Sequence, residues 1–300
     1  MSSDSGKGGR QEGGRQGAVR RLAREFLSRI LGRATGSEGG LPWTGERLVE
    51  GVRGSMALYH LHRYAIARDL AVGKAALDIA CGEGYGANLL AETASKVIGV
   101  DCSEAAIAHA KEKYRRENLE FRVGDCLAIP VESESIDLAV SFETIEHIAE
   151  HELMLAEIKR VLRQDGALVI SSVDREQHPE IPEQPSPFHV KELSGEEFRS
   201  LLQRYFVHVA VLGQAVTLAS IVWEPEPAPL VVDRIHEGTL EEIHSAPSLL
   251  SPHNWIGLCS DHKLPALRPG LFEDRKETAR LERAAEILNS KALRRARRRL

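Results

Sequence analysis

The stretch ALDIACGEGYGANLL, residues 76–90, decides the fold of this chain. Its first part is apolar and predicts a buried strand, after which glycines occur at Gly82, Gly84 and Gly86. Glycine is tolerated where the backbone needs a positive φ or where another group approaches closely. From Ala87 onward the apolar residues are spaced as on one helix face. The stretch therefore predicts a strand, a tight glycine turn and a helix, which is the shape of a nucleotide-type binding loop.

Strand and helix patterns alternate after this loop. Helices are predicted at residues 55–71, from Tyr85, from Glu104 and at 149–162, and the capping-box pattern of Ser194 and Glu197 begins another. Strands are predicted at residues 75–80, 96–101, 119–123, 136–141, 167–172, 206–212 and 255–260. Alternation of this kind predicts a parallel sheet with helices on both faces.

The composition limits the class of protein. The chain has 300 residues, a formal charge of −5 and a pI near 6.2, so its overall charge does not favour nucleic-acid binding. Four cysteines in apolar surroundings and without a CxxC pair predict buried free thiols in a reducing, cytoplasmic compartment. Because no apolar run reaches about 18 residues and the Gly/Ser-rich start has no apolar core, we expect neither a membrane span nor a signal peptide.

The pattern divides the chain into five regions. They are a disordered tail with a basic amphipathic helix (1–40), a lid helix (41–74), a catalytic core (75–222), an extension with a closing strand (223–272), and a charged helix with a basic tail (273–300). Both ends place positive charge beside apolar residues. These ends either pack on the domain or on a second copy, or they bind the inner face of an anionic membrane peripherally. The sequence does not predict the oligomeric state.

Acidic residues after the next two strands narrow the choice of ligand. Asp101 ends the second strand about twenty residues after the glycine loop, where a carboxylate binds a ribose diol, and this position would also suit NAD. Asp125 follows the third strand and can accept a hydrogen bond from an exocyclic amine such as that of adenine. The glycines do not have the GxGxxG spacing of pyrophosphate loops. A nucleoside with an amino-acid tail, which has no pyrophosphate, is consistent with this loop.

Four segments together carry a resemblance to a known family: LDIACGEGYG, VIGVDCSEAAIAHAKEKY, VGDCLAIPVESESIDLAVSFETIEHI and AEIKRVLRQDGALVISS. Over about residues 44–213 the chain resembles the class I S-adenosylmethionine-dependent methyltransferases. The resemblance implies a Rossmann-like α/β fold with a seven-stranded, mostly parallel sheet, and S-adenosyl-L-methionine as cofactor.

The resemblance also implies a cofactor site. Asp78 and Gly82 would line the amino-acid tail of the cofactor, Asp101 would bind its ribose, and Phe142 would lie below its sulfonium. Ala80 stands where the family more often has glycine. The full implied set of cofactor-binding residues is Arg63, Asp78, Ala80, Gly82, Gly84, Tyr85, Asp101, Cys102, Asp125, Cys126 and Phe142, with Asp125 and Cys126 framing the adenine and Arg63 paired with the cofactor carboxylate.

The candidate catalytic residues follow the fourth strand, where open sheets place their ligands. A neutral His147 is a candidate general base, with Glu146 and His189 beside it, although Glu146 and His147 could instead shape the pocket. These three residues and Glu143 could also converge on one divalent metal. In this respect they resemble the E-x-x-E-H motif and later histidine of plant-type small-RNA 2′-O-methyltransferases. No metal ligand is assigned from the sequence.

The flanking segments TGERLVEG, YHLHRYAIA and SPFHVKELSGEEFRSLL resemble a bacterial subgroup associated with the biosynthesis of polysaccharides and glycosylated metabolites. This implies O-methylation of a hydroxyl on a carbohydrate, a glycolipid or a small glycosylated metabolite. The helix that carries Tyr59, His62, Arg63 and Tyr64 would cover the pocket, or simply pack on the domain. The alternatives are a metal-dependent RNA 2′-O-methyltransferase and a catalytically silent interaction module. The acidic residues at three strand ends argue against the silent module.

Overall fold

The computed structural model describes residues 55–176, 187–216, 235–238, 243–246, 252–265 and 271–272. The predicted disordered tail, the basic amphipathic helix and the charged C-terminal helix lie outside the described residues. Contacts divide the chain into two compact units, residues 63–268 on the one hand and residues 1–62 with 269–300 on the other. The sheet and the candidate site belong to residues 63–268.

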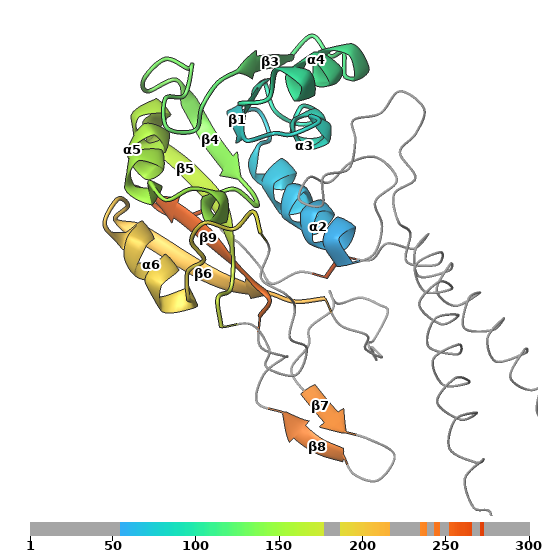
Figure 1. The fold of residues 1–300 in the computed structure, drawn as a ribbon, viewed down its shortest axis with the longest axis vertical. Coiled ribbons are helices and arrows are strands. Elements are labelled where there is room, and N and C mark those ends of the chain that lie inside the picture. The colour runs from blue at the N-terminus through green and yellow to red at the C-terminus, as the bar shows by residue number, and fades with distance from the viewer. Residues whose placement is uncertain are drawn as a thin grey trace, which may run out of the picture. The chain divides into compact units, whose positions relative to one another are not determined.

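A seven-stranded sheet forms the centre of this unit, in the order β3-β2-β1-β4-β5-β9-β6 (Figure 1). Strands β1 to β5 are parallel, and β9 is antiparallel to both of its neighbours. The predicted seven-stranded, mostly parallel sheet is confirmed. The strand bounds are Ala75–Ile79 (β1), Lys96–Asp101 (β2), Leu119–Val123 (β3), Ile136–Ser141 (β4), Leu162–Val173 (β5), His208–Gln214 (β6) and Asn254–Ser260 (β9).

Burial explains why the central strands are mainly apolar. In β1, β2 and β4 all but one residue of each strand is buried, without the alternation of a strand that has one wet face. Helices α2 (Ser55–Leu70), α3 (Tyr85–Leu90) and α4 (Glu104–Lys113) contribute to one apolar core. Helices α5 (His151–Val161) and α6 (Gly195–Gln203) contribute to a second core. Figure 1 shows these two groups on opposite faces of the sheet, as predicted.

The helix starts follow local sequence signals. Ser103 caps α4 by accepting a hydrogen bond from the backbone of Ala106. The predicted capping box of α6 is present, because Ser194 accepts from the Glu197 N–H at 3.3 Å while the Glu197 carboxylate accepts from the Ser194 N–H at 2.9 Å. Each capping interaction satisfies a backbone donor that has no partner within the helix.

Two strand features were not predicted. Strand β5 begins at Leu162, five residues before the predicted start, because the polar residues 163–165 continue the extended chain from α5. Between the predicted strands at 206–212 and 255–260, where no element was predicted, the structure has a two-stranded antiparallel hairpin of β7 (Ile235–Gly238) and β8 (Ile243–Ala246). The predicted closing strand is present as β9, and it lies between β5 and β6 rather than at the sheet edge.

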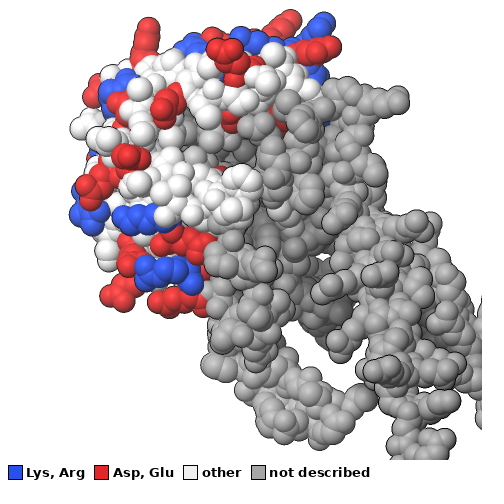
Figure 2. All heavy atoms as spheres, viewed as in Figure 1, with Lys and Arg blue, Asp and Glu red and all other residues white. Residues whose placement is uncertain are grey.

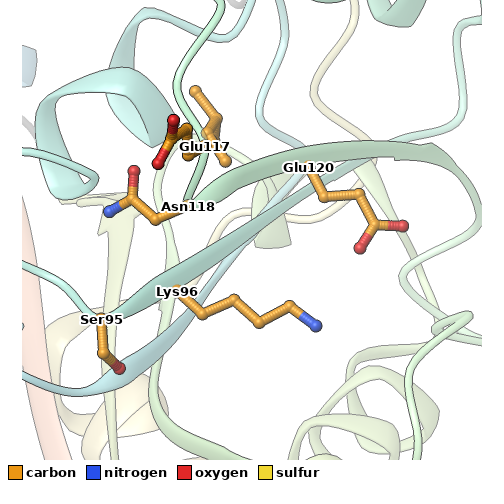
Figure 3. A pocket seen from close by; sticks show the side chains of 6 residues that line it. Ser95, Lys96, Glu117, Asn118 and Glu120 are labelled. Carbon is orange, nitrogen blue, oxygen red and sulfur yellow. The ribbon is translucent and has the colours of Figure 1, made fainter.

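The described surface has no long basic field on the face shown in Figure 2, where acidic and basic side chains are mixed. None of the helices in the described ranges is both long and apolar enough to cross a bilayer. A pocket lined by Ser95, Lys96 and residues 117–120 lies at the start of β2 and β3 (Figure 3). Ligands of open parallel sheets bind at the carboxyl ends of the strands, and this pocket lies at the amino-terminal ends, away from the candidate site.

Candidate active site

The glycine loop connects β1 to α3 through three residues with left-handed backbone. Ala80 has φ of 58°, Gly82 has 57° and Gly84 has 89°. A non-glycine residue in this region places its Cβ too close to the backbone, at a cost of about 1–2 kcal/mol. Ala80 is exposed, so its side chain fits, but the conformation explains why a glycine is common at this position in the family that the sequence resembles.

The chain's own aromatic side chains occupy the space beside two of the glycines. A Cβ built on Gly86 would lie 2.0 Å from Cζ of Tyr64, and one built on Gly84 would lie 2.7 Å from Cζ of Phe121. These glycines therefore allow α2 and β3 to pack against the loop. A contact of Gly82 or Gly84 with the cofactor stays a prediction.

Tyr64 connects α2 to the end of β1. Its hydroxyl donates to the Asp78 carboxylate, at 3.0 Å from Oδ1 and 3.2 Å from Oδ2, and both side chains are buried. Burial raises the pKa of Asp78 to about 7, whereas hydrogen bonds from Tyr64 and from the backbone of Ala87 lower it. The Tyr64 ring also packs edge-on against Phe142 and Tyr85, with centroids 5.0 and 5.3 Å away. Sequence reasoning did not assign Tyr64 to the cofactor site, and its only signal was its place in the predicted lid helix.

Asp101 joins the glycine loop to the end of β2. Its carboxylate accepts hydrogen bonds from the Gly82 N–H at 2.8 Å and from the Ser103 N–H at 2.9 Å. These two donors fix the direction of the carboxylate at the carboxyl end of the strand. The two predicted cofactor motifs therefore meet in space. Cys102 follows as an exposed residue, so the prediction that all four cysteines are buried is wrong, because this residue lies in the loop after β2.

The loop after β3 carries the predicted adenine-side residues. Asp125 is exposed and accepts a hydrogen bond from the Leu127 N–H at 2.9 Å. Burial and the neighbouring charge of Asp125 raise the pKa of the Cys126 thiol to about 12, so the thiol is neutral. Asp78, Asp101 and Asp125 thus occupy the ends of β1, β2 and β3, in the order in which those strands lie in the sheet. These three acceptors fit a ligand with an ammonium group, a diol and an amine along its length, as S-adenosylmethionine has.

Arg63 directly precedes Tyr64 in α2 and reaches the other half of the site. It is fully buried, donates through Nε to Oε1 of Gln214 at 2.7 Å and forms an ion pair with Glu143. Glu143 follows β4 and has a left-handed φ of 50°. These partners place Arg63 between the ends of β4 and β6. Its predicted contact with the cofactor carboxylate stays a prediction, and sequence reasoning did not find Gln214.

The candidate catalytic residues come together after β4, in and beside the short 3₁₀ helix η1 (Ile145–His147). Potential ligand atoms of Glu146, His147 and His189 lie within 4.8 Å of one another. The N–H groups of Val190 and Lys191 donate to the carbonyl of Glu146 at 2.8 and 3.1 Å and hold the later segment against η1. The structure thus brings together three of the four residues predicted to converge, while Glu143 pairs with Arg63.

The two histidines have fixed orientations. Nδ1 of His147 lies 3.1 Å from the carbonyl oxygen of Phe188, and Nδ1 of His189 lies 2.5 Å from Oε1 of Glu192. Both oxygens are acceptors, so Nδ1 carries the proton and the lone pair of each neutral ring is on Nε2. Glu192 was not predicted, and only its spacing of three residues from His189 could have suggested it.

Glu146 differs from the other acidic groups of the site. Its side chain is 0% exposed, and neither carboxylate oxygen has a hydrogen-bond partner among the described residues. Burial raises the pKa of Glu146 well above its usual range, and the charge of Glu143 raises it further. Burial and a neighbouring negative charge disfavour the ionised form of a carboxyl group, and a cation bound beside it favours that form.

Comparison with known proteins found similar sequences and solved structures. Residues 77–170 match a family described as "Methyltransferase domain". A probable S-adenosylmethionine-dependent methyltransferase of Mycolicibacterium smegmatis is 35% identical over 166 residues, 54% of this chain and 64% of that protein. One from Mycobacterium tuberculosis is 34% identical over 184 residues, 60% of this chain and 66% of that protein. Among solved structures, an S-adenosylmethionine-dependent methyltransferase of Thermotoga maritima aligns with a TM-score of 0.49 and 20% identity, over 69% of this chain and 90% of that one.

Residues 77–170 match the methyltransferase-domain family, and the sheet order and the acidic residues at the strand ends agree with the class I S-adenosylmethionine-dependent methyltransferases that the sequence resembles. The cofactor of this class is S-adenosyl-L-methionine, which fits the three hydrogen-bond-accepting carboxylates at the strand ends. The chain spans slightly less than two thirds of the length of the mycobacterial relatives it matches.

Proposed function

We propose that this protein is an O-methyltransferase that transfers the methyl group of S-adenosylmethionine to a hydroxyl of a carbohydrate, a glycolipid or a small glycosylated metabolite. The observation that carries the proposal is the cluster of His147, His189 and Glu146 at the carboxyl end of β4. In a methyltransferase this edge of the sheet is where the acceptor meets the activated carbon.

The chemistry of a hydroxyl acceptor requires a group of this kind. Methyl transfer is an in-line displacement, in which the enzyme positions the nucleophile and removes its proton if the nucleophile is a hydroxyl. The carbonyl of Phe188 holds His147 with its lone pair on Nε2, so a neutral His147 can accept that proton. If the cluster acts without a metal ion, His147 is the general base.

The relatives support a hydroxyl acceptor without defining it. A Mycobacterium tuberculosis protein that is 35% identical over 116 residues, 42% of its length, is named phthiotriol/phenolphthiotriol dimycocerosates methyltransferase. That name gives a triol derivative as the acceptor of the relative. The flanking segments favour a glycosylated acceptor for this chain.

RNA 2′-O-methylation is the second candidate function, because the same cluster also resembles the metal-binding pattern of that reaction. The net charge of −5 and the mixed charges in Figure 2 favour the smaller acceptor. A silent interaction module is disfavoured, because it has no use for the oriented carboxylate of Asp101.

The test uses cofactor labelled in its methyl group with separate glycolipid, polysaccharide, metabolite and small-RNA fractions. We expect label in a carbohydrate-containing fraction, attached as an O-methyl ether. His147→Ala should lower kcat by about a hundredfold or more while leaving S-adenosylmethionine affinity unchanged. Label confined to RNA, or to a nitrogen or carbon atom of any acceptor, would contradict the proposal.

A further inference from the structure

The buried carboxylate of Glu146 is costly in the protein as it stands. It is fully buried and has no hydrogen-bond partner among the described residues. Burying a polar group without a compensating partner is unfavourable, and burying a charge without a partner is more so. An unpartnered buried group of this kind needs an explanation, and an absent cation is one.

Two imidazole rings lie beside that carboxylate. His147 and His189 are arranged edge to face with ring centroids 5.1 Å apart, and each offers one nitrogen to the cluster. Because Nδ1 of each ring is oriented toward an acceptor, the Nε2 atoms carry the lone pairs that a metal requires.

We propose that Glu146, His147 and His189 form a binding site for one divalent transition-metal ion. Two imidazoles and one carboxylate suit Zn²⁺, Mn²⁺, Fe²⁺ or Co²⁺, whereas Mg²⁺ and Ca²⁺ take mainly oxygen ligands. Ligand atoms at about 2.1 Å from a tetrahedral ion lie about 3.4 Å apart. The potential ligand atoms of the cluster, all within 4.8 Å of one another, are near that spacing.

The surroundings have the features of a built metal site. Metal-bound histidines usually donate their second ring N–H to a carboxylate or a backbone carbonyl, as His189 does to Glu192 and His147 does to Phe188. The hydrogen bonds from residues 190 and 191 to the Glu146 carbonyl keep the two ligand-bearing segments together. Glu143, the remaining acidic residue of the motif, is engaged by Arg63, which leaves a three-residue site.

The role of the ion rests on the proposed function. Three protein ligands leave coordination positions for an oxygen atom, and a hydroxyl bound there releases its proton to water more readily. The oxygen then forms its bond to the methyl carbon as the bond from carbon to sulfur breaks and its electron pair stays on sulfur. His147 is then a metal ligand rather than the general base.

The test measures metal binding without cofactor or acceptor. Untagged full-length protein is stripped with a chelator, titrated with Co²⁺ in the absorption spectrometer, and melted with and without equimolar Zn²⁺ or Mn²⁺. We expect one ion per chain and a rise in melting temperature on metal addition. Glu146→Gln should lower the affinity more than about a hundredfold, and Glu192→Gln about 10- to 100-fold. The matched control is His208→Ala, an exposed histidine on β6, which should bind metal like the wild type.

Glu146→Gln also separates a metal ligand from a merely structural residue. Without metal it should melt at the same temperature as the wild type or higher, because it removes a buried carboxylate, yet metal should no longer stabilise it. S-adenosylmethionine binding by this variant verifies that it is folded. Wild-type protein that binds no stoichiometric ion, or Glu146→Gln that binds it equally well, would overturn the site. Metal binding without any O-methyl product would instead contradict the proposed function alone.

Discussion

The buried Asp78 makes the stability of this domain depend on pH in a direction opposite to that of most carboxylates. Its pKa is about 7 in the folded protein and 3.8 in its unperturbed state, so the folded state retains the proton over this interval. The contribution of protonated Asp78 to the free energy of unfolding is fully present below about pH 4 and is lost as the pH rises to about 7. At about 1.4 kcal/mol per pH unit, the loss between pH 5 and pH 8 is about 2.7 kcal/mol.

Asp78→Asn removes this titration while keeping an oxygen that can accept from Tyr64. We expect its free energy of unfolding to be less dependent on pH than that of the wild type, by about 2.7 kcal/mol between pH 5 and pH 8. Urea unfolding of both proteins at four pH values in this range measures the difference. Other titrating groups, Glu146 among them, are present in both proteins, so their contributions to the pH dependence cancel in the difference. Equal pH dependence of the two proteins would refute the assignment of a buried, proton-retaining Asp78.

The remaining predictions concern the glycine loop. Ala80→Gly should raise the free energy of unfolding by about 0.5–1 kcal/mol, since it relieves the left-handed backbone at 58°, and a lower urea midpoint would count against this. Gly86→Ala should lower it by about 1–3 kcal/mol, because the new Cβ displaces the Tyr64 ring. Unchanged stability there would show that the ring moves at no cost. Tyr64→Phe should raise the pKa of Asp78 further, since it removes a hydrogen bond to the carboxylate. Nuclear magnetic resonance titration measures this pKa, and a value equal to that of the wild type would contradict the prediction.

The strands and helices of the core were predictable because their signals are local. The apolar runs that became β1, β2 and β4 are buried on both faces, and the capping residue of α6 lies within one turn of the helix it begins. The position of β9 was not predictable in this way, because its partners β5 and β6 are distant in sequence. Its residues showed that a strand forms, and the resemblance to a known family implied the seven-stranded sheet.

The candidate site was predictable in its members but not in its pairings. The motif after β4 and the later His189 were recognised from spacing, and the structure brings them together. The ion pair of Arg63 with Glu143 depends on how α2 lies over the sheet, which no local pattern encodes. The packing of Tyr64 against Gly86 has the same origin, and it explains why a side chain at position 86 would clash.

Binding of S-adenosylmethionine, followed by calorimetry, tests the central claim most directly. We predict one cofactor per chain for the wild type. For Asp101→Ala, which loses a carboxylate that two backbone donors orient beside Gly82, we predict an affinity lower by about 1.5–3 kcal/mol, or roughly 10- to 150-fold. Unfolding curves of the variant at the same temperature verify that it is folded during the titration. No binding to the wild type, or an unchanged affinity in Asp101→Ala, would contradict the account.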